Sequence, residues 1–393
     1  MPESESEMKD KTRILAETKA YACLDCGKCT AACSVAHHDP GFSPRMLVYD
    51  AIHGTDSQAL NDDRLWECLT CAACEVVCTS AVRFGDFIRA LRSQAQQSGI
   101  TGQCAHGGAI QSLMHIMSAE ELQQDRLDWV PRQLEVAKTS DTLYFVGCAP
   151  YFDAFFADLE VKTLQASLGS IALLNRMGIR PAVSPNERCC GHDLLNSGDV
   201  EGFLKLARQN VKEIQATGAK RVVVSCPEGY HTLKVEYPRY LGDTGFEVVH
   251  LSQLLAEAVA NGQLEFKKSK KKVTYHDSCR LGRISGIYEE PRMVLRAIEG
   301  LQLQEMAHHK AHALCCGTQS WMNCGTINKQ MQIELLKEAK TTGADTLIVA
   351  CPKSQIHLKC AMHDEGPGQQ LQIKIQDFAG FVAGKLAGQE VNP

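Results

Sequence analysis

A doubled cysteine that occurs twice constrains the fold of this chain more than any other feature. The motifs Cys189-Cys190-Gly191 and Cys315-Cys316-Gly317 each lie between two strand-like runs that end in cysteine. The run-end cysteines are Cys148 and Cys226 around the first motif, and Cys279 and Cys351 around the second. Helical segments alternate with these runs, which predicts a mostly parallel α/β sheet in each copy. The chain therefore contains an internal duplication, and its cysteines are expected to meet where the strands end.

The abundance of cysteine, 19 in 393 residues, indicates either disulfides or metal sites. Disulfide frameworks belong mostly to small secreted chains without a sufficient core, whereas this chain is long and 44% hydrophobic. Residues 1–11 are polar and lack the apolar segment of a signal peptide, and no stretch approaches the ~18 apolar residues of a transmembrane helix. We therefore expect a cytoplasmic protein with metal-binding thiolates; simple buried thiols are the alternative. The net charge of −5 gives no reason to expect a nucleic-acid partner.

Two further cysteine runs, which begin at Cys23 and Cys68, have the spacing C-x₂-C-x₂-C-x₃-C. This is the spacing of bacterial two-cluster ferredoxins, in which the fourth cysteine of each run binds the other cluster. The expected ligands are Cys23, Cys26, Cys29 and Cys78 for one [4Fe–4S] cubane, and Cys68, Cys71, Cys74 and Cys33 for the second. No proline follows either run, and residues 44–52 and 84–97 have amphipathic helical patterns. We therefore predict an α-helical ferredoxin module.

The predicted fold class is α/β, with an N-terminal α-helical two-cluster module followed by two duplicated α/β Cys-Cys-Gly domains. The predicted boundaries are 1–17 for a disordered tail, 18–98 for the ferredoxin module, 99–140 for a connector, 141–266 for the first Cys-Cys-Gly repeat and 273–386 for the second.

This order of parts resembles the heterodisulfide reductases, in the form that fuses the iron–sulfur and Cys-rich subunits into one chain (the D-type subunit). The resemblance covers about residues 20–380, and residues 275–283 (Tyr-His-Asp-Ser-Cys-Arg-Leu-Gly-Arg) look like the family's start of the second repeat. In that family each complete repeat has five cysteines and ends in Cys-x-x-Cys. The resemblance implies a non-cubane [4Fe–4S] cluster there, on which a disulfide is split.

The sequence departs from the family at the fifth cysteine, which is replaced by Gly229 in the first repeat and by Ser354 in the second. The remaining ligand candidates are Cys148, Cys189, Cys190 and Cys226 in the first repeat, and Cys279, Cys315, Cys316 and Cys351 in the second. Four thiolates suffice for a cubane or an altered non-cubane cluster. Cys324, Cys360 and Ser354 are candidate extra ligands of the second repeat, which we expect to hold a cluster. A cluster, a zinc ion or no metal remain open for the first repeat.

Two functions remain open. The first is an electron-transfer subunit of a heterodisulfide reductase-like complex; the resemblance implies that some complexes of this kind bifurcate electrons. The missing fifth cysteines favour this electron-transfer function. The second is a disulfide reductase that acts at the second-repeat cluster, with His276 or His192 as proton donor, although such histidines more often orient a ligand. No dinucleotide fingerprint follows a strand, so the resemblance implies a partner subunit that contains flavin, beside other redox subunits.

Overall fold

The structure, a computed structural model, describes residues 5–387. Its contacts divide the chain into two compact units, which are described separately. The first unit comprises residues 1–115, 192–203 and 314–332, and the second comprises residues 116–191, 204–313 and 333–393. The predicted domains were contiguous, whereas these units are interleaved. Two short segments from the Cys-Cys-Gly repeats belong with the ferredoxin module.

The first unit is built from short helices around one apolar core. The helices that lie wholly or mostly in it are α1 (Glu5–Glu17), η1 (Ala20–Ala22), α2 (Lys28–Ala31), α3 (Ser34–His38), α4 (Pro44–His53), α5 (Asp56–Leu60), α6 (Arg64–Glu67), α7 (Ala73–Val76), α8 (Phe84–Gln97), η2 (Ala105–Gly108), α9 (Ala109–Met117) and α12 (His192–Ser197). The two amphipathic stretches predicted from sequence form α4 and α8. The apolar stripe of α8, including Phe87 and Ile88, is fully buried and forms the centre of the core.

The prediction of a disordered tail over residues 1–17 is wrong for residues 5–17. They form helix α1, which packs on α8, and Ile14 is only 4% exposed in the core of the first unit. The acidic composition misled the prediction because a single apolar face is enough to dock a short helix on a packed neighbour. Residues 1–4 lie outside the described part of the chain.

The second unit contains two parallel sheets with the same topology. The strands are β1 (Thr142–Phe145), β2 (Arg221–Val224), β3 (Glu247–His250), β4 (Lys272–His276), β5 (Gln302–Gln304), β6 (Thr346–Val349) and β7 (Lys374–Asp377). Their order is β1-β2-β3 in one sheet and β5-β4-β6-β7 in the other, and every pairing is parallel. A parallel bridge between Leu143 and Ala182 occupies the place that β5 takes beside β4. The shared topology agrees with the duplication in the sequence.

The helices of the second unit connect these strands. They are α10 (Ala149–Phe155), η3 (Ala157–Leu159), α11 (Leu164–Arg176), α13 (Val200–Ala216), α14 (Pro227–His231), η4 (Thr232–Glu236), α15 (Tyr237–Leu241), α16 (Leu251–Ala260), α17 (Glu289–Arg296), η5 (Lys310–His312), α18 (Thr326–Thr341), α19 (Pro352–His363), η6 (Pro367–Leu371) and α20 (Phe378–Ala383). Among the described residues, none of the helices combines the length and the apolar character needed to cross a bilayer.

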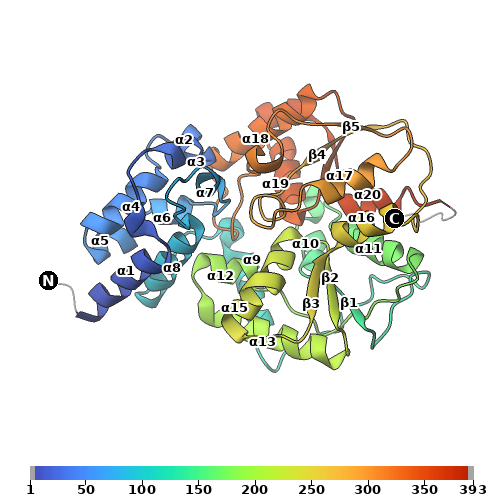
Figure 1. Ribbon diagram of the computed structural model, residues 1–393, viewed down its shortest axis with the longest axis horizontal. Coiled ribbons are helices and arrows are strands. Elements are labelled where there is room, and N and C mark those ends of the chain that lie inside the picture. The colour runs from blue at the N-terminus through green and yellow to red at the C-terminus, as the bar shows by residue number, and fades with distance from the viewer. Residues whose placement is uncertain (1–4, 388–393) are drawn as a thin grey trace. The chain divides into compact units, whose positions relative to one another are not determined.

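The two repeats join through reciprocal helix pairs, because α11 packs on α20 and α16 packs on α17 (Figure 1). Each pair joins the helix that follows the first strand of one repeat to the helix that follows the last strand of the other. Gly169 permits the close approach of α11 to α20, since a Cβ atom there would lie 2.6 Å from the carbonyl oxygen of Ala379. The cysteines that follow β1, β2, β4 and β6 all belong to this unit.

Candidate metal centres

The two ferredoxin runs share one backbone conformation. Asp25 and Gly27 in the first run, and Thr70 and Ala72 at the same offsets in the second, all have positive φ angles of 53°, 76°, 44° and 59°. This conformation costs roughly 1–2 kcal/mol for a residue other than glycine, so its repetition indicates a functional constraint. It turns amide groups toward the sulfur atoms: the Thr70 amide donates to Cys68 Sγ at 3.3 Å. Such loops suit an anionic iron–sulfur cluster.

Four thiols line one hollow in the first unit: Cys33, Cys68, Cys71 and Cys74. Burial, followed by the charges of Cys71 and Cys68, raises the pKa of Cys33 to about 12. Burial and the neighbouring thiols also raise the pKa of Cys74 well above its ordinary value. Thiolates packed this closely need a cation to be ionised together, so the donor set fits a metal cluster. The hollow contains the cysteines predicted for the second cubane, including the crossed ligand Cys33.

The first run is more open. Cys26 is exposed, and Cys23 and Cys29 are half-buried. Burial raises the pKa of Cys29, and the charge of nearby Cys23 adds to the effect. Helix α2, which carries Cys29, packs on α7, which lies between Cys71 and Cys78 in the second run. The Cys78 sulfur accepts the amide of Val82 at 3.4 Å.

Arg92 fixes the backbone around Cys68 in the second run. Its side chain is fully buried and donates to the carbonyl oxygens of Leu65 at 2.9 Å, Cys68 at 2.7 Å and Asn196 at 2.9 Å. The Asn196 amide also lies 3.4 Å from the ring nitrogens of His192. The structure therefore places His192, a candidate proton donor, in the first unit.

The second Cys-Cys-Gly motif also belongs to the first unit. Cys315 is 3% exposed and lies in the same apolar core as Leu69 and Cys68 of the second ferredoxin run. The amide of Asn323 donates to the Glu67 carbonyl at 3.1 Å and so ties the loop after the motif to the residue before Cys68. Cys316 is buried and Cys324 is exposed. Cys279 and Cys351 belong to the second unit, so the ligand set predicted for the second repeat stays a prediction.

The four cysteines of the first repeat lie together in the second unit. Cys148 Sγ is 3.4 Å from Cys189 Sγ. Burial raises the pKa of Cys226, and the charges of Glu228 and Cys190 raise it further. Tyr237 donates its hydroxyl to the Cys190 carbonyl at 3.1 Å, which fixes the doubled cysteine against α15. This set resembles the ferredoxin hollow in its chemistry, and it too fits a metal.

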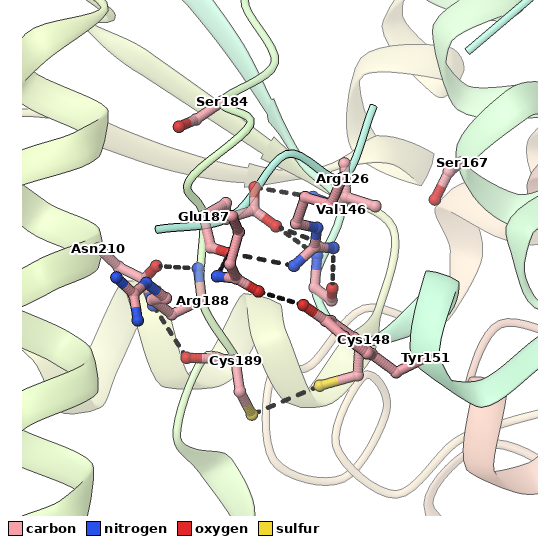
Figure 2. A network of polar contacts seen from close by, with 12 residues as sticks. Arg126, Val146, Cys148, Tyr151, Ser167, Ser184, Glu187, Arg188, Cys189 and Asn210 are labelled. Carbon is pink, nitrogen blue, oxygen red and sulfur yellow. Dashed lines mark hydrogen bonds and ion pairs between the residues drawn. The ribbon is translucent and has the colours of Figure 1, made fainter. Parts of the chain in front are cut away.

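A buried polar network that the sequence did not reveal positions Cys148 and Cys189 (Figure 2). Glu187 accepts the amides of Val146 at 3.1 Å and Gly147 at 2.7 Å. Arg126 lies 3.8 Å from the Glu187 carboxylate. Burial raises the pKa of Glu187 to about 7, although Arg126 and the two amides act in the opposite direction. The network joins the strand end before Cys148 to the turn before Cys189.

The second repeat has a different network behind Cys279. Asp277 and Arg292 form a fully buried ion pair at 2.7 Å, and Arg292 also pairs with Glu305 at 2.7 Å. His276, the other candidate proton donor, ends β4 and is 2% exposed. The only sign of the Asp277–Arg292 ion pair in the sequence is the position of Asp277, two residues before Cys279.

The two repeats meet at a buried ion pair. Lys353 Nζ lies 2.8 Å from Glu228 Oε2, and their side chains are 2% and 11% exposed. The two residues hold the same position in the duplicated sequence, two residues after Cys351 and Cys226. Burial raises the pKa of Cys351, as do the charges of Glu228 and Cys226, whereas Lys353 lowers it. The Cys-Pro ends of both repeats therefore share one electrostatic environment.

Comparison with known proteins finds family models that match both cysteine-rich parts of the chain. A family model for a 4Fe-4S dicluster domain matches residues 19–82, and a model for a Cysteine-rich (CCG) domain matches residues 142–234 and 273–359. The D-type subunit of dihydromethanophenazine:CoB–CoM heterodisulfide reductase from Methanosarcina acetivorans is 30% identical and is aligned over 93% of each chain. The chain belongs to the family of these heterodisulfide reductase subunits. It is thus an iron–sulfur protein related to oxidoreductase subunits.

Other relatives of this heterodisulfide reductase-like chain carry different names. The B-type subunit of fumarate reductase (CoM/CoB) from Methanothermobacter marburgensis is 24% identical over 92% of this chain and 72% of its own length. The EtfAB:quinone oxidoreductase of Syntrophomonas wolfei is 34% identical over 56% of this chain and 30% of its own length. A crystal structure of a hypothetical protein from Helicobacter pylori covers 99% of this chain and 74% of its own with a TM-score of 0.57 at 12% identity, which shows a shared fold.

The two missing fifth-cysteine positions of the heterodisulfide reductase-like chain are both closely packed. A Cβ atom built on Gly229 would lie 3.8 Å from Cys226 Cβ and 3.2 Å from Val224 Cγ1. Ser354 is 1% exposed, and its Oγ has no hydrogen-bond partner among the described residues. Cys360 lies about 13 Å along α19 from Cys351 at the helical rise, and its sulfur is 3.9 Å from Asp364. The candidacy of Cys360 as an extra ligand therefore stays a prediction.

Proposed function

We propose that this chain is an electron-transfer subunit of a heterodisulfide reductase-like complex. The observation that carries the proposal is the composition of the first unit. It contains both ferredoxin runs together with Cys315 and Cys316, and Cys315 shares an apolar core with the second run. A chain that relays electrons needs redox groups close to one another, and this unit supplies the thiols of both cubanes and two of the four thiols proposed for the terminal cluster.

In this proposal the cysteines form four ligand sets: two for cubanes, one for a terminal cluster and one in the first repeat. Cys23, Cys26, Cys29 and Cys78 bind one cubane; Cys68, Cys71, Cys74 and Cys33 bind the second; Cys279, Cys315, Cys316 and Cys351 bind the terminal cluster. When bound, such clusters supply one-electron carriers whose potentials depend on hydrogen bonds and exposure. Arg92 and the left-handed loop residues hold the thiols and amides of the second run in place. The first repeat takes a cluster or a zinc ion at Cys148, Cys189, Cys190 and Cys226.

The partner in this proposal is a subunit that contains flavin, within a complex that bifurcates electrons in some relatives. The relationship to an EtfAB:quinone oxidoreductase supports a redox partner. Gly229 and Ser354 support a relay role, because the family's fifth cysteine, which helps to form the disulfide-cleaving cluster, is missing in both repeats.

A second candidate is a disulfide reductase that acts at the second-repeat cluster. The alignment over 93% of each chain with a CoB–CoM heterodisulfide reductase subunit favours it. So does the orphaned hydroxyl of Ser354, a buried polar group that suits an additional contact to a cluster. A serine is a harder and less acidic ligand than a thiolate, and we therefore place this function second.

The test uses the chain purified without oxygen, with its iron and zinc counted. We expect iron for at least two cubanes, reduction by dithionite, no turnover of CoB–CoM heterodisulfide, and no new paramagnetic species when thiol is added after oxidation. The variant Ser354→Cys should change the spectrum of the second-repeat cluster, whereas Ser170→Cys, at a buried serine of α11, should not. Heterodisulfide turnover by the isolated wild-type chain would instead establish the reductase.

A further inference from the structure

The two ferredoxin runs have equivalent residues in very different surroundings. Leu24 follows Cys23 and is 72% exposed, whereas Leu69 follows Cys68 and is 3% exposed. Tyr21 is 66% exposed, whereas Trp66, at the same offset in the second run, is half-buried and packs on the core. The apolar side chains at equivalent positions are thus buried in the second run and exposed in the first.

The residues that bury the second run include a cysteine of the second Cys-Cys-Gly motif. Leu69 lies in one core cluster with Cys315, and Arg92 stacks on Trp66 at 5.7 Å from the ring centroid. Exposed leucine and tyrosine side chains beside an exposed thiol such as Cys26 are costly to leave in water. The internal duplication indicates what should cover them: a surface that carries another redox group.

The bare surface extends onto α7 and has a basic rim. Val76, on α7, is 47% exposed, and α7 packs on α2 of the first run. Lys19 and Lys28 are exposed, and neither forms an ion pair within the described chain. The nearby acid Asp25 is tied to Arg45 at 2.9 Å. A basic rim around an apolar centre, on a chain whose net charge is −5, favours a partner with an acidic rim.

We propose that this first-run face, made of Tyr21, Leu24 and Val76 with Lys19 and Lys28 at its rim, is the docking site of an acidic ferredoxin, a redox protein separate from the flavin subunit. The proposal rests on the proposed function, because the first run must hold a cluster for a partner there to exchange electrons. The face is small, as in transient electron-transfer complexes. A membrane surface is disfavoured, because stable attachment needs a polybasic cluster or a long amphipathic helix.

The test measures binding of an acidic bacterial two-cluster ferredoxin to the holoprotein by calorimetry, and its rate of reduction of the holoprotein by stopped flow. We expect wild-type binding to weaken with salt. The double variant Lys19→Glu/Lys28→Glu should weaken binding at low salt by about tenfold or more, and Tyr21→Ser and Leu24→Glu should weaken it at every salt concentration. Matched controls in the second unit are Lys220→Glu and Met293→Glu, whose side chains are also exposed; they should bind as the wild type does.

Each variant is checked for iron content and for reduction by dithionite, which needs no docking site. Wild-type chain that retains iron but fails to bind the ferredoxin, or first-run variants that bind it with wild-type affinity, would overturn the docking proposal. So would binding of the wild type to phosphatidylglycerol vesicles that the same variants abolish. A holoprotein without a cubane in the first run would overturn the proposed function instead, and iron counts and spectra distinguish that failure from a loss of docking. Tyr21→Ser lies outside the C-x₂-C-x₂-C-x₃-C run, so it tests the face even where variants within the run lose iron.

Discussion

Replacement of Lys353 by methionine tests whether the two repeats depend on their buried ion pair. The Lys353 side chain is 2% exposed and that of Glu228 is 11% exposed, with 2.8 Å between the charged atoms. Removal of the lysine takes a neutralising charge away from a buried carboxylate, and breaking a buried pair in this way costs about 3–5 kcal/mol. Against a total stability of about 5–15 kcal/mol, that loss is large enough to measure in a urea titration of the holoprotein.

The same variant should also weaken metal retention. Glu228 raises the pKa of both Cys226 and Cys351, and Lys353 lowers that of Cys351. Without the lysine, the Glu228 carboxylate opposes ionisation of both thiols more strongly, so iron or zinc should be lost to a chelator faster than from the wild type.

Two controls separate charge from packing. The double variant Glu228→Gln/Lys353→Met removes both charges and should recover most of the stability lost in the single variant. Lys220→Met breaks an exposed pair with Asp141, whose charged atoms are 3.8 Å apart, and should leave the urea midpoint unchanged. The reasoning is refuted if Lys353→Met unfolds at the wild-type urea concentration, or if the double variant is no more stable than the single one.

Three further predictions test separate parts of the structure. Gly169→Ala should lower stability in urea, because its Cβ atom would lie 2.6 Å from the Ala379 carbonyl oxygen. Overpacking of this kind costs about 2–3 kcal/mol and helix propensity returns ~1 kcal/mol, so the net loss should be about 1–2 kcal/mol; unchanged stability would contradict this packing. His250 caps α16, and burial lowers its pKa to about 4. The neutral histidine therefore stabilises the fold above its unfolded pKa, and this stabilisation is lost as the pH falls. His250→Asn should remove about 2 kcal/mol of the acid-induced loss of stability between about pH 7.5 and 5, and an unaltered profile of urea midpoint against pH would refute this. Cys33→Ala should abolish the paramagnetic signal of the cubane held by Cys68 and its run while sparing the first; loss of the first-run signal alone would refute the crossed ligation.

The sequence predicted the elements with strong periodicity. Helix α8 has the predicted bounds of residues 84–97, because its apolar residues recur on one stripe that is buried in the structure. The strands before Cys148 and Cys226 were also predicted, since apolar runs of β-branched and aromatic residues specify buried parallel strands. The cysteine spacing predicted that Cys33 joins the second run, and the hollow that holds these thiols supports this grouping.

What the sequence could not predict depends on tertiary contacts between distant residues. Arg126 and Glu187 are 61 residues apart, and no periodic pattern links a connector arginine to a carboxylate before Cys189. The ion pair of Glu228 with Lys353 joins positions 125 residues apart in the numbering. Helix α1 forms because α8 offers an apolar face to Ile14, a partner that the composition of the tail does not reveal.

The residue before each doubled cysteine differs between the two repeats. Arg188 is fully buried and donates to the carbonyl oxygens of Met117 at 2.9 Å and Ala119 at 3.1 Å. A buried guanidinium needs several acceptors, and the segment predicted as a mere connector provides them, so the first motif is fixed within the second unit. Leu314 holds the same position in the second motif and is half-buried, and a leucine side chain has no donor for such carbonyl groups. The adjoining Cys315 lies in the apolar core of the ferredoxin unit. The second motif is thus the one that shares a core with the ferredoxin thiols, which favours the second repeat over the first in the proposal of a terminal cluster.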